Sequence, residues 1–92
     1  MLENLCAITL YKKYGSGIYY FNRNIEVDFY VPDEGLAVQA CYRMSDKATL
    51  EREIKALVAM NSLYPLTKAM IVTYEDEGVM ERDGLKTEIV PV

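Results

Sequence analysis

The side chains best suited to chemistry fall at alternate positions on two predicted strands. Glu26 and Asp28 lie on one strand, and Gln39 and Cys41 lie on the strand that returns after a turn at residues 32–35. Side chains two positions apart on a strand point to the same face of a sheet. A face that carries two carboxylates offers the oxygen ligands that Mg²⁺ prefers. The commoner role of such acids is a solvated face or a structural hydrogen-bond network.

The register of this hairpin decides whether the four side chains meet. With Asp33 and Glu34 as the two central residues of the turn, Val31 pairs with Leu36. If the ladder continues in this register, polar residues of the two strands lie opposite each other. Asp28 then pairs with Gln39, and Glu26 pairs with Cys41. The opposite face is apolar and suits a core; its residues are Val27, Phe29, Val38 and Ala40.

A third carboxylate, Glu3, comes from the first predicted helix, which we expect to lie over or beside the polar cluster. An acid in the first turn is also favoured by the helix dipole, and this is its commoner role. Gln39 and Cys41 most simply pack within the sheet. The candidate metal ligands are therefore Asp28, Glu3 and Glu26.

The first element that must position these residues is a helix over residues 2–14. It ends with Lys12 and Lys13 before Gly15, and basic residues in a last turn followed by glycine are typical of a helix end. Its apolar residues wrap far round the helix, so we expect it to be substantially buried.

Three strands follow, at residues 18–21, 25–31 and 36–42, with turns at 22–24 and 32–35. The second strand alternates apolar and polar residues with a period of two. Because both connections are short, we expect an antiparallel meander.

A second helix begins at a cap provided by Ser45 or Asp46 and ends before Pro65. Its apolar face is expected to contain Leu50, Ile54, Leu57 and Val58. Residues 69–74 then form a buried strand, parallel to a neighbour because a helix precedes it. The last two strands flank an Asp83-Gly84 turn. The order α-β-β-β-α-β-β-β predicts one domain over residues 1–92, an α+β mixed sheet flanked by helices.

Composition excludes several classes of site. The 92 residues contain no histidine, which removes Cys/His zinc sites and histidine-based triads. The net charge of −4 opposes strong binding to a phosphate backbone. Two cysteines and no long apolar run indicate a cytoplasmic protein that does not enter a membrane.

Tyrosine is abundant, and in a chain without a basic groove we expect it to pack on the sheet with hydroxyls at the rim rather than to stack on bases. The tyrosines are Tyr11, Tyr14, Tyr19, Tyr20, Tyr30, Tyr42, Tyr64 and Tyr74.

An ordered series of segments resembles a domain of unknown function at the C-terminus of bacterial and archaeal AAA-type ATPases. The segments are Leu2-Glu3-Asn4, Ile18-Tyr19-Tyr20-Phe21, Glu26-Val27-Asp28-Phe29, residues 49–57, Ile71-Val72-Thr73-Tyr74, Asp83-Gly84 and Ile89-Val90-Pro91. The resemblance covers nearly the whole chain. It implies a restriction-endonuclease-like fold of the PD-(D/E)xK class, and a chain that is the C-terminal part of a longer ATPase.

The resemblance also implies a site, made of a helix Glu, a strand Asp and a Glu-x-Lys pair. Glu3 matches the helix Glu, Asp28 the strand Asp, Gln39 the second acid and Cys41 the lysine. Gln39 lacks the negative charge that offsets dehydration of Mg²⁺, and Cys41 cannot supply a cation. We expect a vestigial site with no catalytic residue, in which the Cys41 thiol faces Glu26, lies close to Asp28 and is harder to ionise than usual.

The sequence thus predicts a non-catalytic module for recognition or assembly, without a bound cofactor and without an ATP-binding motif. Its expected partner is its own N-terminal ATPase module, with a homo-oligomer and a weak DNA contact left open. One alternative is a Mg²⁺-dependent DNA nuclease with a non-standard site that uses Glu3, Asp28 and Glu26. Another is a structural dimerisation domain.

Overall fold

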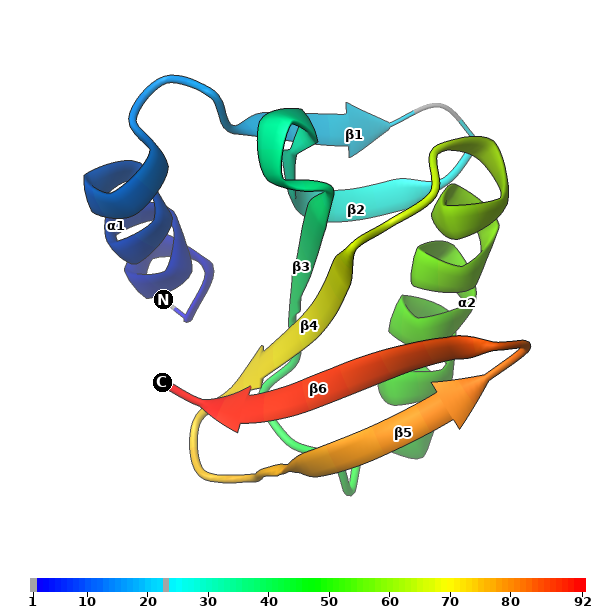
Figure 1. The fold of residues 1–92 in the computed structure, drawn as a ribbon. Helices are drawn as coiled ribbons and strands as arrows, with labels where there is room; N and C mark the ends of the chain where they lie inside the picture. Colours follow the sequence, from blue (N-terminus) through cyan, green and yellow to red (C-terminus); the bar gives the residue numbers. More distant parts are fainter. Residues whose placement is uncertain (1, 23) are drawn as a thin grey trace.

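The computed structural model describes residues 2–22 and 24–92 and has the predicted order α-β-β-β-α-β-β-β (Figure 1). It is an α+β fold, with two helices and a six-stranded mixed sheet. The elements are α1 (Leu2–Tyr14), β1 (Tyr19–Asn22), β2 (Glu26–Val31), a 3₁₀ turn (Pro32–Glu34), β3 (Leu36–Ala40), α2 (Lys47–Leu63), β4 (Lys68–Thr73), β5 (Gly78–Arg82) and β6 (Leu85–Pro91). None of the helices in these ranges is long and apolar enough to cross a membrane.

The sheet has the strand order β1-β2-β3-β4-β6-β5. The first three strands form the predicted antiparallel meander. β4 is parallel to both of its neighbours, β3 and β6, as expected for a strand reached through a helix. β5 returns antiparallel to β6 at the edge of the sheet. The two helices lie on opposite sides of this sheet (Figure 1).

Two turns depend on residues that accept a left-handed backbone. Gly35 closes the 3₁₀ turn with a φ of 59°, and a Cβ atom there would lie 2.7 Å from Oγ1 of Thr67. The predicted Asp83-Gly84 turn is confirmed, with φ values of 52° and 83°. Two consecutive positive φ values are the geometry of a type I′ hairpin. The turn predicted at residues 22–24 includes Arg23, which lies outside the described residues.

The core has two parts, one on each face of the sheet. On the α2 side, Leu50, Ile54, Leu57 and Met60 pack on buried residues of the strands, and the partly buried Val58 packs against them, which confirms the predicted apolar face of this helix. Asp46 caps the helix, as one of the two expected residues, by accepting from the main-chain N of Thr49. On the α1 side the buried cluster is smaller and contains Val31, Leu36 and Val38.

The expectation that the first helix is substantially buried is wrong. Only Leu2 and Cys6 are buried along α1. Leu5, Ile8 and Tyr11 are 45%, 55% and 64% exposed. The reason is the number of layers: one helix on the outside of a sheet buries only the stripe that faces the strands.

The predicted pairing of Val31 with Leu36 is confirmed, and the ladder continues to Phe29 and Val38. The predicted apolar face of Val27, Phe29, Val38 and Ala40 is wrong at Val27, whereas Phe29 and Val38 do share a face. Val27 packs in the core cluster on the α2 side, whereas Phe29 and Val38 pack on the α1 side. The register with β1 shifts along β2, which accommodates an extra residue before Tyr30. Such a β-bulge turns the following side chains to the other face.

Candidate functional site

The candidate site forms beside this bulge, where the paired part of the ladder between β2 and β3 ends at Phe29 and Val38. Oδ2 of Asp28 accepts a hydrogen bond from the main-chain N of Ala40 at 2.8 Å. The main-chain N of Asp28 donates to Oε1 of Gln39, also at 2.8 Å. Side chains therefore replace the main-chain hydrogen bonds that a regular ladder would make. The structure brings Asp28 and Gln39 together, as the sequence predicts.

The side chain of Gln39 is fully buried and is bonded at both ends of its amide. While Oε1 accepts from Asp28, Nε2 donates to the main-chain O of Glu26 at 3.0 Å and to that of Glu53 at 3.4 Å. Gln39 thus links the bulge in β2 to α2, which packs on one face of the sheet. A buried amide that satisfies three main-chain groups has a structural role that explains its presence in the core.

Cys41 lies apart from the acids that it was expected to face. It is 2% exposed in the core cluster on the α2 side, and its Sγ donates to the main-chain O of Arg43 at 3.4 Å. Burial raises the pKa of the thiol, and the carboxylates of Glu53, Asp46 and Asp76 raise it further against the effect of that hydrogen bond. The prediction of a thiol that is hard to ionise is confirmed. The expected position opposite Glu26 is corrected, because the ladder has already broken at Asp28.

Asp28 is the centre of negative charge in the site. Burial raises the pKa of its carboxyl group, the hydrogen bond from Ala40 lowers it, and the charges of Glu3 and Glu26 raise it again. Glu3 and Glu26 are themselves exposed. Asp28 and Glu3 also raise the pKa of the buried Cys6 thiol, after burial itself. The beginning of α1 therefore lies beside Asp28, as expected.

Glu53 on α2 is a member of this site that the sequence analysis missed. The pKa of its carboxyl group is raised to about 7, first by burial and then by the charge of Asp28, with Arg52 acting in the opposite direction. Glu53 comes three residues after Leu50 and directly before Ile54, so it borders the buried stripe of α2. An acid at the border of an apolar stripe was the signal that could have identified it.

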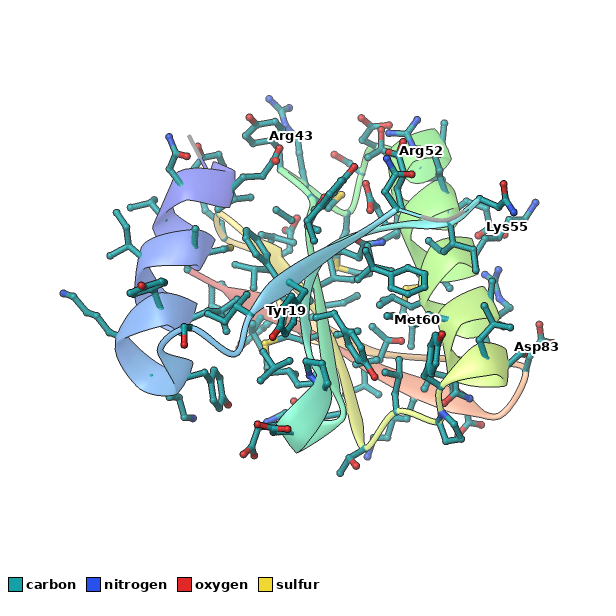
Figure 2. The ribbon with its side chains drawn as sticks, turned by 90° about the horizontal axis from the view of Figure 1, so that it is seen from above. Tyr19, Arg43, Arg52, Lys55, Met60 and Asp83 are labelled. Atoms are coloured by element: carbon teal, nitrogen blue, oxygen red, sulfur yellow. The ribbon has the colours of Figure 1, made fainter. Side chains whose placement is uncertain are left out.

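These groups line a surface hollow of about 560 Å³ between β2 and α2. The acids Glu26, Asp28 and Glu53 lie on one part of its wall, and the α2 residues Arg52 and Lys55 on another. Figure 2 shows both basic side chains along α2, beside the end of the molecule where β1 and β2 are connected. The hollow combines protonatable carboxyl groups with fixed positive charge.

The donor set does not fit a Mg²⁺ ion. Gln39 already uses its carbonyl oxygen, and one oxygen of Asp28 is taken by Ala40. Throughout residues 2–22 and 24–92, no group of three or more Cys, Asp or Glu residues has an arrangement that can hold a metal ion. In the same ranges every buried side-chain nitrogen or oxygen has a hydrogen-bond partner, so none is left free for an ion.

Comparisons of the chain with protein-family models, curated proteins and solved structures find no significant match. The resemblance to the C-terminal domain of AAA-type ATPases therefore stays a prediction from the quoted segments.

Proposed function

We propose that this chain is a non-catalytic recognition or assembly module with a restriction-endonuclease-like arrangement of strands. The observation that carries the proposal is the side chain of Gln39, which is 0% exposed and hydrogen-bonded to the main chain of β2 and α2. At the position where phosphodiester chemistry requires an exposed acid, this protein has a structural amide.

The other members of the site support the same conclusion. The Cys41 thiol is buried and its pKa is raised, so it stays neutral at neutral pH, and a thiol cannot provide the positive charge of a lysine. The Glu53 carboxyl, with a pKa of about 7, is only partly ionised at neutral pH. The sequence resemblance supports the proposal that an AAA-type ATPase module is the partner of this chain.

A cleavage assay tests the proposal against its enzymatic alternative. The purified chain is incubated with plasmid and with single-stranded DNA in Mg²⁺ and in Mn²⁺, alongside Asp28→Ala. We expect no cleavage by either protein, because the site lacks a complete set of free ligands. Cleavage by the wild type that Asp28→Ala abolishes would establish the nuclease with a non-standard site.

The exposed stripe of α1 favours a second candidate, the dimerisation domain. Leu5, Ile8 and Tyr11 follow one another at intervals of three residues, and each is at least 45% exposed. Apolar stripes of this kind often mark protein–protein contacts. Analytical ultracentrifugation over a wide concentration range tests it: a dimer that Ile8→Glu dissociates supports this role, and a monomer at all concentrations excludes it.

A further inference from the structure

A pair of stacked tyrosines lies beyond the carboxyl ends of two parallel strands. Tyr42 follows β3 and Tyr74 follows β4, and their ring centroids are 5.5 Å apart with 19° between the ring planes. The side chains are 55% and 41% exposed. The expectation of tyrosines packed on the sheet is wrong for these two, because they extend past its end, and also for Tyr11, which is 64% exposed on α1.

Hydrogen bonds between the two loops hold the rings in place. The main-chain N of Tyr74 donates to the O of Tyr42 at 3.4 Å. The main-chain N of Met44 donates to Oδ2 of Asp76 at 2.8 Å. Thr73 Oγ1 accepts from the main-chain N of Asp76 at 2.9 Å and donates to its O at 2.8 Å. The pair is therefore a preorganised aromatic surface, since its loops need little ordering on binding.

The rings border a hollow of about 420 Å³ whose other lining residues are mostly charged. Glu75 and Asp76 come from the loop after β4, and Arg43 and Ser45 come from the loop after β3. Figure 2 shows Arg43 at this end of the molecule, away from Tyr19 on β1. Both loops lie at the protein surface, and the hollow is open to solvent.

The charge around this hollow is negative on balance. Of the residues that line it, Glu75 and Asp76 are acidic and Arg43 is basic. Asp46 and Glu77 are two further acids in the same loops, and Lys47 is the first residue of α2. In the described part of the chain, no ion pair involves Glu75 and no cation lies over either ring.

We propose that the Tyr42–Tyr74 pair and Glu75 bind an arginine side chain of a protein partner. A guanidinium group is planar and stacks on aromatic faces, and it can donate two parallel hydrogen bonds to one carboxylate. A nucleotide would bring its phosphate close to Glu75 and Asp76, so the charge favours a cation over a stacked base. This site is separate from the hollow at Asp28 and does not depend on the function proposed for it.

NMR titration of the isotope-labelled chain with N-acetyl-arginine amide tests the proposal. We expect saturable shifts of the Tyr42 and Tyr74 ring signals, with a dissociation constant in the millimolar range. N-acetyl-citrulline amide has nearly the same shape without the charge, and we expect it to bind at least about fivefold more weakly. Adenosine monophosphate is the third probe, and we expect no saturable shift.

Matched variants locate the binding. Tyr74→Ala and Glu75→Gln should each weaken binding by about three- to tenfold, because each removes one part of the recognition. Tyr74→Phe keeps the ring, and Tyr19→Ala removes an exposed tyrosine elsewhere; both should bind like the wild type. Equal binding of the citrulline compound, unchanged binding by Tyr74→Ala in a folded sample, or tighter binding of the nucleotide would overturn the proposal. The cleavage assay tests the site at Asp28, so the arginine-binding proposal and the proposed function can fail independently of each other.

Discussion

At the scale of single residues, Gln39 and Glu53 define the candidate site more than the acids that drew attention in the sequence. Gln39 joins β2, β3 and α2 through main-chain partners. The pKa of the Glu53 carboxyl group is raised to about 7. Both residues are tied to the bulge in β2, so the local break in the ladder organises the whole site.

Replacing Gln39 tests its structural role. Gln39→Leu keeps the approximate size but leaves the main-chain groups of Asp28, Glu26 and Glu53 without their partner. We expect the free energy of unfolding to fall by about 2 to 4 kcal/mol, measured by urea denaturation. Glu26→Gln, an exposed change on the neighbouring strand β2, should alter it by less than about 0.5 kcal/mol. An unchanged free energy of unfolding in Gln39→Leu would contradict the structural role of Gln39.

The raised pKa of Glu53 predicts how stability depends on pH. Its carboxyl has a pKa of about 7 in the folded chain, against 4.5 as the ordinary value, so the folded state binds more protons between these values. Stability is therefore greatest below about pH 4.5 with respect to this group and falls as the pH rises through 7. The raised pKa of Asp28 acts in the same direction.

Glu53→Gln removes the Glu53 part of this dependence. We expect its free energy of unfolding to exceed that of the wild type at pH 8 by on the order of 1 kcal/mol, a value reduced by partial exposure. Urea denaturation from pH 4.5 to 8 measures the slope. Glu51→Gln on the same helix is the matched control, because Arg82 lowers the pKa of Glu51 and the contribution of that group is lost only as the pH falls. An unchanged slope in Glu53→Gln would refute the assignment.

At the scale of elements, the turns combine backbone conformation with close packing. Gly35 ends the 3₁₀ turn and approaches Thr67, whose main-chain N donates to the O of Gly35 at 2.8 Å. This contact joins the β2–β3 hairpin to the segment that enters β4. Gly84 has a similar φ, but a Cβ atom there would meet nothing within 4 Å.

Alanine variants of Gly35 and Gly84 separate the cost of backbone strain from the cost of steric overlap. Gly84→Ala adds only the cost of a left-handed alanine, about 1 to 2 kcal/mol. Gly35→Ala adds overlap with Thr67 to the same strain, so we expect a larger loss of about 2 to 4 kcal/mol. Thermal unfolding of both variants measures the difference. Equal losses would mean that the loop of Thr67 moves aside without cost.

At the scale of the whole molecule, stability depends mainly on the core cluster between the sheet and α2. That cluster contains the fully buried side chains of Leu57, Met60 and Ile71, whereas the α1 side buries fewer large side chains. A chain of 92 residues has a modest core, so one large cavity is a substantial part of its total stability.

Leu57→Ala should therefore destabilise the protein severely. The side chain is 0% exposed, and its truncation is expected to cost about 2 to 5 kcal/mol. Val79→Ala, at a position that is 60% exposed on the edge strand β5, should cost less than about 0.5 kcal/mol. Circular dichroism during urea denaturation compares the two variants. A small effect of Leu57→Ala would show that the main core lies elsewhere.

The sequence by itself determined the order of the elements, the meander, the parallel β4, the buried face of α2 and the Asp83-Gly84 turn. These features follow from patterns within a few residues, such as apolar periodicity, caps and the backbone preferences of glycine. The local pairing of Val31 with Leu36 was predictable for the same reason, because a short turn sets the register of its own hairpin.

Only the tertiary structure decided which side chains meet across the sheet. The bulge in β2 places Val27 and Phe29 on opposite faces of the sheet. Gln39 is hydrogen-bonded to α2, and Cys41 does not lie opposite Glu26. Three further features depend on residues that are distant in the sequence. They are the exposure of α1, the environment of Glu53 and the stacking of Tyr42 on Tyr74. Periodicity assigns a residue to a face of its own element, but burial and charge depend on what packs against that face.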